Sequence, residues 1–208
     1  MGTGVKNSYP FIYPSQPHVR KHGPMGYPRY GMYRNWLRDE FVFTCVYCLR
    51  RETWVTLRRD WELDHHVPKA IRPELKLDYD NLVYACSTCN RTKAANLAPD
   101  PCKVAFGSCV EVDEYGEIHR IGDSTDGTAL IEALGLDADD YNELRRAVFE
   151  LRDALPIGSK AYRRWFGYPN ELPDLSKERT PPKGNKRPNG IRESYFEMSK
   201  RKALPQRY

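Results

Sequence analysis

The sequence has no long apolar run. No stretch of the 208 residues approaches the roughly 20 consecutive apolar residues that a transmembrane helix needs. The N-terminal segment Tyr9–Pro14 is also too short, and contains too much proline, to form the apolar part of a signal peptide. We therefore expect a cytoplasmic protein with no membrane partner.

Acidic residues are absent from residues 1–38, which hold six Lys and Arg. Residues 176–208 hold ten basic residues against three acidic ones, so the rest of the chain has a charge balance of −8 although the whole chain is +5. Basic ends on a small protein indicate a polyanionic partner, most often a nucleic acid. The alternative is that they only increase solubility and bind nothing.

The chain shows no internal repeat and is rich in proline (16) and tyrosine (14), which favours long irregular segments. An extended N-terminal arm is expected at 1–35, a core that contains two cysteine pairs at 36–100, a hairpin and helical extension at 101–170, and a basic, mostly disordered tail at 171–208. We expect an α+β fold.

Apolar periodicity and turn residues predict the individual elements. In the core we expect a short helix at 36–41, strands at 54–57, 61–65 and 82–85, and a helix from Ser87, as its cap, to about Asn96, with Pro99 closing it. Beyond the core we expect a hairpin at 110–121, helices at 127–135 and 139–155, and a short helix around 194–202. The apolar face of the helix at 139–155 is expected to consist of Leu144, Ala147, Val148, Leu151 and Leu155.

Four of the six cysteines form two Cys-x-x-Cys pairs, Cys45 with Cys48 and Cys86 with Cys89. Two such pairs can complete a tetrahedral site with no open position, as in structural zinc sites. Four buried reduced thiols are the alternative. The 37 residues between the pairs are more than a compact zinc finger needs, so this segment should have a further role. Cys102 and Cys109 lack the paired spacing and are interpreted as small apolar residues.

The segment between and around these pairs resembles the HNH endonuclease family. The matching residues occur in the family's order and spacing over about 50 residues, from Cys45 to Asn96: Asp64-His65-His66-Val67-Pro68, Asp80-Asn81-Leu82 and Cys86-Ser87-Thr88-Cys89-Asn90-Arg91-Thr92-Lys93. The resemblance implies a ββα-metal core with a general-base histidine, held together by the four-cysteine zinc site. Asn90 stands where many members carry the last histidine, which makes this an HNN variant.

The resemblance also implies roles for single residues. His65 matches the general base, and a neutral imidazole is suited to taking a proton near pH 7. Asp64 and Asn90 would bind the catalytic metal, and because both offer oxygen we expect Mg²⁺ or Mn²⁺ there. Asn81 would hold the loop behind the histidine rather than touch substrate. Lys93, one helical turn after Asn90, is expected to contact a phosphate.

The roles of several neighbouring residues stay open. Arg91 is either a phosphate contact or a surface charge, and Glu62 either supports the water around the metal or is a solvated acid. His66 is interpreted as structural, because strand alternation turns it away from the face of His65. His18 and His22 do not form a metal motif by their spacing and are interpreted as surface or packing residues.

The sequence thus predicts a metal-dependent endonuclease that hydrolyses DNA, with double-stranded DNA as its partner and Zn²⁺ as its structural ion. The alternative is a zinc-stapled nucleic-acid-binding module without cleavage activity. A nuclease specialised for RNA or for a phage structure is a third possibility. A protein of bacterial or phage type would fit, acting as a homodimer or within a larger defence or packaging complex; symmetric cutting of both strands would need two active sites.

Overall fold

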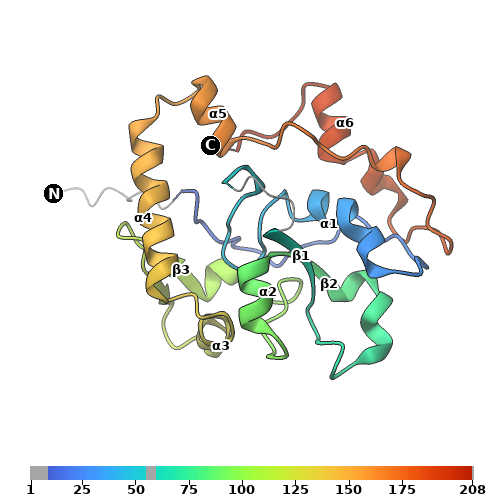
Figure 1. Ribbon diagram of the computed structural model, residues 1–208, viewed down its shortest axis with the longest axis horizontal. Helices are drawn as coiled ribbons and strands as arrows, with labels where there is room; N and C mark the ends of the chain where they lie inside the picture. Colours follow the sequence, from blue (N-terminus) through green and yellow to red (C-terminus); the bar gives the residue numbers. More distant parts are fainter. Residues whose placement is uncertain (1–8, 55–59, 208) are drawn as a thin grey trace. The chain divides into compact units, whose positions relative to one another are not determined.

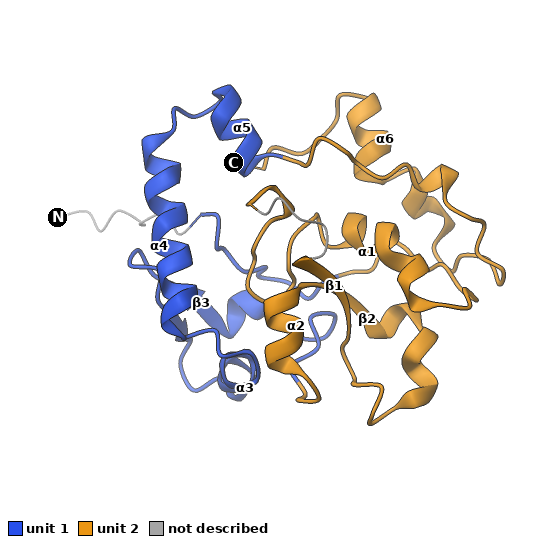
Figure 2. Cartoon of the chain, viewed as in Figure 1, with its two compact units in different colours: residues 1–18, 98–167, 208 blue, residues 19–97, 168–207 orange. Residues whose placement is uncertain are grey.

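The computed structural model describes residues 9–54 and 60–207, which form two compact units (Figures 1 and 2). Of the described residues, 9–18 and 98–167 form unit 1, and 19–54, 60–97 and 168–207 form unit 2. Both units mix helices with short antiparallel strands, as expected for an α+β fold. Within the described ranges no helix is long and apolar enough to cross a membrane.

Unit 2 is built around a two-stranded sheet. Strands β1 (Trp61–His65) and β2 (Leu82–Cys86) pair antiparallel, with Trp61 opposite Cys86 and His65 opposite Leu82. Helix α2 (Ser87–Lys93) follows β2 directly and packs on the sheet. The other α-helices among the described residues of unit 2 are α1 (Arg34–Glu40) and α6 (Tyr195–Lys200). This ββα order at the predicted positions places the polar residues of β1 beside those of α2.

Aromatic side chains supply much of the apolar interior of unit 2. Trp61 and Tyr84 stack with their ring centroids 5.0 Å apart and their planes inclined by 6°. The Tyr84 hydroxyl donates to Glu52 at 2.6 Å, and Glu52 also accepts two hydrogen bonds from Arg38 at 2.8 Å. This network attaches α1 to the sheet. Large aromatic rings bury much apolar area per residue, so unit 2 can form its interior around a sheet of only two strands.

The first and last parts of unit 2 pair with each other. Residues 23–25 and 184–186 run antiparallel around a bridge between Pro24 and Asn185, with the Met25 amide donating to the Gly184 carbonyl at 2.9 Å. Gly190 lies against the Lys21 carbonyl so closely that a β-carbon would clash with it. The described residues of the predicted tail 171–208 therefore belong to unit 2, and the described residues of the predicted arm 1–35 are divided between the two units.

Unit 1 contains the predicted hairpin and three helices. Its elements are β3 (Val110–Val112), β4 (Ile118–Arg120), α3 (Thr125–Leu134), α4 (Asp139–Ala154) and α5 (Lys160–Phe166). Helix α3 begins with a cap from Ser124 and ends at Gly135 in the left-handed conformation. The buried Arg145 of α4 donates to the carbonyl oxygens of Gly116 and Leu136, and so holds the hairpin turn to the loop between the helices.

Three local predictions need correction. Helix α2 is capped by the Cys86 thiol, which accepts from the Cys89 amide, and not by Ser87, and it ends at Lys93 because Ala94 adopts a positive φ. The buried face of α4 consists of Tyr141, Arg145, Val148 and Phe149; of the five residues predicted, Val148 is buried and Ala147 is exposed. Trp54 lies in a 3-10 turn at Glu52–Trp54 instead of a strand, and 55–57 lie outside the described residues.

Candidate nuclease site and metal centre

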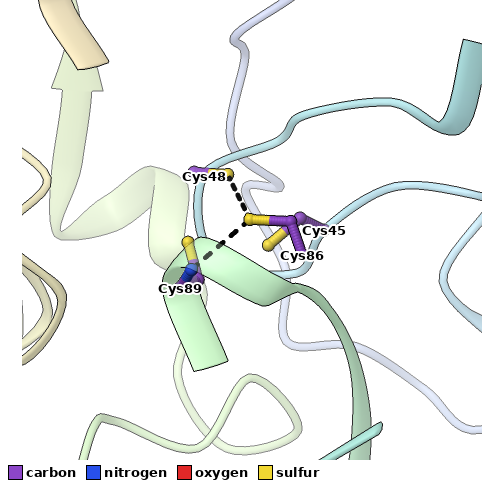
Figure 3. Close-up of side chains that lie close together, drawn as sticks. All are labelled: Cys45, Cys48, Cys86 and Cys89. Atoms are coloured by element: carbon purple, nitrogen blue, oxygen red, sulfur yellow. Dashed lines mark hydrogen bonds between the residues drawn. The ribbon is translucent and has the colours of Figure 1, made fainter. Parts of the chain in front are cut away.

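The four paired cysteines come together at one point of unit 2 (Figure 3). Cys45 and Cys48 lie in a tight turn, Cys86 ends β2, and Cys89 lies in the first turn of α2. All four are buried and form no disulfide, and their sulfur atoms lie within 4.8 Å of one another. The Sγ atoms of Cys48 and Cys86 are 3.7 Å apart, close to the roughly 3.8 Å edge of a tetrahedron with zinc–sulfur bonds of about 2.3 Å. The donor set and spacing fit a structural zinc ion.

The thiol protons are unequally distributed within this cluster. Hydrogen bonds from Cys45, Cys48 and Cys89 lower the pKa of Cys86, while hydrogen bonding to Cys45 and burial raise the pKa of Cys48 and of Cys89. The thiolate form is therefore favoured at Cys86 and the protonated thiol at Cys48 and Cys89. A divalent ion would replace those protons, since metal ligation requires thiolates.

Asp64 lies near the end of β1 with its side chain 5% exposed. Its carboxylate accepts a hydrogen bond from the Tyr47 hydroxyl at 2.6 Å and forms an ion pair with the Lys93 amine at 3.1 Å. The Lys93 amine also donates to the backbone carbonyl of His65 at 3.0 Å. These contacts fix the orientation of Asp64. Lys93, the one buried lysine among the described residues, is the counter-ion of Asp64.

His65, the next residue, turns its ring away from this network. Its Nε2 lies 3.0 Å from the Lys76 carbonyl oxygen, and the Tyr30 ring packs edge-on against it at 5.0 Å between centroids. Because a carbonyl can only accept, Nε2 must carry the proton, which leaves Nδ1 of the neutral ring as the proton acceptor. Burial lowers the pKa of His65 from its ordinary value of 6.5, although the Lys76 carbonyl and the charge of Asp64 oppose this. The neutral form is thus favoured near pH 7.

Asn81 closes the loop that follows His65. Its Oδ1 accepts from the Val67 amide at 2.9 Å, and its Nδ2 donates to the Val67 carbonyl at 3.0 Å. Its own carbonyl accepts from the His66 amide at 2.8 Å. The side chain is buried and holds backbone, which is the contact pattern of a residue that positions the histidine segment without reaching a substrate.

Asn90 and Glu62 form a second contact between α2 and β1. The Asn90 amide donates to the Glu62 carboxylate, and both side chains are half-buried. Glu62 and Asp64 occupy the same face of β1 because they are two residues apart. One face of the strand therefore presents two carboxylates to α2, Asp64 facing Lys93 and Glu62 facing Asn90. Oxygen donors of this kind suit Mg²⁺ or Mn²⁺.

The two residues of α2 that were predicted to contact phosphate differ in their exposure to solvent. Arg91 is exposed, but Lys93 is fully buried and engaged with Asp64 and His65. We therefore revise the role of Lys93 from a phosphate contact to an internal counter-ion. The helical spacing places Lys93 on the expected face of α2, but the helix packs that face onto β1.

Tyr47 and Tyr30 contact predicted site residues, although no sequence pattern indicates either of them. Tyr47 lies between two cysteines and no motif distinguishes it, and Tyr30 is distant in sequence from His65. Among the other histidines, His22 is a buried packing residue whose Nε2 lies 2.8 Å from Asp39. His66 is half-buried, and His18 lies in unit 1.

Comparison with known proteins agrees with this geometry. No curated protein matches the chain. A family model described as HNH endonuclease matches residues 45–96. This range includes both cysteine pairs, the strand that holds Asp64 and His65, the 3-10 turn that ends at Asn81, and the helix that holds Asn90. Members of this family are nucleases that use a divalent metal, which implies a nucleic acid substrate for the domain. The chain therefore carries an HNH endonuclease domain at residues 45–96.

Proposed function

We propose that the chain is a metal-dependent endonuclease that hydrolyses phosphodiester bonds in DNA, with His65 as the general base. The observation that carries this proposal is the Nε2 contact of His65 with the Lys76 carbonyl at 3.0 Å. That contact fixes both the direction of the ring and the tautomer, so Nδ1 is free of its proton. His65 then takes a proton from the attacking water.

Asp64 and Asn90 would hold the catalytic ion in this proposal, and Glu62 could support them. A bound Mg²⁺ or Mn²⁺ would neutralise charge on the scissile phosphate and on the departing oxygen. The chain's own contribution is orientation: Tyr47 and Lys93 hold the Asp64 carboxylate, and Asn81 holds the backbone after His65. Zn²⁺ at Cys45, Cys48, Cys86 and Cys89 would attach the start of α2 to the turn of the first cysteine pair.

Double-stranded DNA is the substrate we propose, because both basic ends of the sequence suit a polyanion. Of these ends, residues 176–207 contribute to unit 2, the unit that also holds the nuclease site. Arg91, exposed on α2, would contact a phosphate. A homodimer would provide the two active sites that cutting of both strands requires.

Cleavage of supercoiled plasmid by the purified full chain tests this proposal. With Mg²⁺ or Mn²⁺ the wild type should nick or linearise the plasmid, and His65→Ala should lose about 10²- to 10⁴-fold in rate, the usual contribution of a general base. His119→Ala, which changes an exposed histidine of unit 1, is the matched control and should cleave like wild type. Cleavage that persists in His65→Ala would refute the assigned base.

The alternative, a zinc-stapled binding module without cleavage activity, predicts a different outcome. The chain would then retard the plasmid on a gel, yet leave it supercoiled with either ion. Parallel reactions with labelled duplex DNA, single-stranded DNA and RNA separate the proposed substrate from the others. Faster cleavage of RNA than of duplex DNA would contradict DNA as the substrate.

A further inference from the structure

A cavity of about 500 Å³ lies beside the proposed general base in unit 2. Its lining consists of residues 28–32 together with Lys76 and Leu77. Cavities of roughly 300–1,000 Å³ are typical of small-ligand sites in proteins. This volume is therefore sufficient for a unit the size of one nucleotide.

The cavity shares two of its lining residues with the environment of His65. Tyr30 packs its ring against the imidazole at 5.0 Å, and the Lys76 carbonyl oxygen binds Nε2 at 3.0 Å. An occupant of the cavity would therefore contact two residues that also contact His65, the group that would activate water.

The two walls of the cavity are fixed to each other. One wall belongs to the 3-10 turn Tyr30–Tyr33 and the other to the 3-10 turn Pro73–Leu77. The buried Tyr33 lies between them: its hydroxyl donates to the Leu77 carbonyl at 3.1 Å, and its ring packs against Tyr79 at 5.5 Å. The cavity is thus part of the folded unit and does not depend on a moving loop.

The lining of the cavity combines aromatic, apolar and cationic side chains. Tyr30 offers an aromatic ring, Leu77 is 40% exposed, and Pro28 and Met32 add apolar surface. Arg29 and Lys76 add two exposed cationic side chains, and no acidic residue is among the lining. A free phosphate would not need the aromatic wall, and an apolar ligand would not need two cations. A nucleotide uses both, because its base can stack on tyrosine and its phosphate can pair with Arg or Lys.

We propose that this cavity is a substrate subsite that takes one unstacked nucleotide adjacent to the scissile phosphate. This inference rests on the proposed nuclease function, since it assigns the subsite to the substrate of His65. A base inside a duplex cannot enter a cavity, so the bound nucleotide has to leave its stack or come from an unpaired region. The nuclease should accordingly favour sites where one base is easily unstacked.

Abasic scanning of a mapped cleavage site tests the subsite. Each nucleotide around the cut in a labelled DNA substrate is replaced in turn by an abasic one. With the wild type, one position should lower kcat/KM by about 5- to 150-fold, the equivalent of the roughly 1–3 kcal/mol that stacking on an aromatic side chain contributes. In Tyr30→Leu this position should lose its effect. Tyr115→Leu, which changes an exposed tyrosine of unit 1, should retain the wild-type profile.

A binding assay and a second variant test the subsite without relying on cleavage or on a change at a residue that contacts His65. Binding of the same oligonucleotides to His65→Ala, measured by fluorescence anisotropy, should show the same position dependence without cleavage. Arg29→Ala, which leaves the contacts of His65 intact, should reduce the slope of log affinity against log salt by about one. A flat abasic profile in both assays, or one that Tyr30→Leu leaves unchanged, would overturn the subsite. Absence of cleavage with a retained binding profile would instead refute the nuclease proposal alone.

Discussion

The buried amine of Lys93 lies 3.1 Å from the carboxylate of Asp64. The lysine side chain is fully buried and that of the aspartate is 5% exposed, so each is the main neutralising charge for the other. The same amine reaches the carbonyl of His65 at 3.0 Å. One side chain at the end of α2 thereby fixes both of the adjacent residues that the proposed mechanism needs on β1.

Lys93→Met should destabilise the protein strongly. Removing one partner leaves the Asp64 carboxylate buried with no compensating charge, which typically costs about 3–5 kcal/mol. The free energy of unfolding in urea should fall by that amount. Asp64→Asn combined with Lys93→Met should restore part of it, because the uncompensated charge is then gone.

Lys200→Met is the control for this prediction. Lys200 pairs with Glu197 at the surface, with its side chain 54% exposed, and such pairs contribute about 0–1 kcal/mol. If Lys93→Met lowered stability no more than Lys200→Met, the ion pair with Asp64 would not have the role assigned to it.

Cys86→Ser should remove both zinc and stability. Cys86 is the thiol to which the other cysteines of the cluster hydrogen-bond, and it also caps α2 through the Cys89 amide. Structural zinc contributes directly to folding, so the variant should bind less than one zinc per chain and melt at a lower temperature. Cys102→Ser, outside the cluster, should keep its zinc. If zinc analysis of the purified wild-type protein found no zinc, that result would contradict the zinc site itself.

Asn81→Asp should destabilise the loop after His65 despite the similar shape of the two side chains. The aspartate has no N–H to give to the Val67 carbonyl and would place a charged oxygen against it. Leaving a buried acceptor without its donor costs about 1–3 kcal/mol. Thermal melting should report that loss, and Asn96→Asp, at an exposed position, should show little. If Asn81→Asp melted at the same temperature as the wild type, the contacts with Val67 would not be needed for stability.

The positions of the main elements of the core could be predicted from the sequence. Trp61–His65 alternates apolar and polar residues, and the Cys-x-x-Cys pairs mark the turn and the helix start, so β1, β2, α2 and the cysteine cluster lie where local patterns place them. The family motif indicated the backbone-holding contacts of Asn81, and it places His65 and Asp64 together at the end of β1.

Contacts between distant segments could not be predicted from such patterns. Lys93 is a basic residue on a predicted helix, and only the packing of α2 on β1 turns its side chain inward to Asp64. Tyr30 reaches His65 because residues 19–35 lie in unit 2. The composition of residues 171–208 predicts disorder. Their described residues nevertheless pair with residues 23–25 and with Asp80, segments that lie more than 100 residues away in the sequence.

The contact between the basic tail and the nuclease domain centres on Asp80. Its carboxylate pairs with Arg187 at 3.0 Å and with Lys186 at 3.2 Å, next to the motif residue Asn81. Partial burial raises the pKa of Asp80, but the hydrogen bonds and charges of Arg187 and Lys186 outweigh it, so the pKa lies below its ordinary value of 3.8. The ionised form is therefore the one that stabilises the folded state.

Asp80 should consequently stabilise the folded state above pH 3.8, and this contribution should disappear as the pH falls further. Because the pKa is lower when folded than when unfolded, the contribution is complete above the unfolded value and disappears as pH falls through the folded one. Asp80→Asn should lower the free energy of unfolding by about 0.5–1 kcal/mol at pH 7 and pH 5, since the pair is partly screened by solvent. Carbon NMR should place the Asp80 midpoint below 3.8 and move it upward in Arg187→Gln. A midpoint unmoved by Arg187→Gln would show that the tail does not bind there.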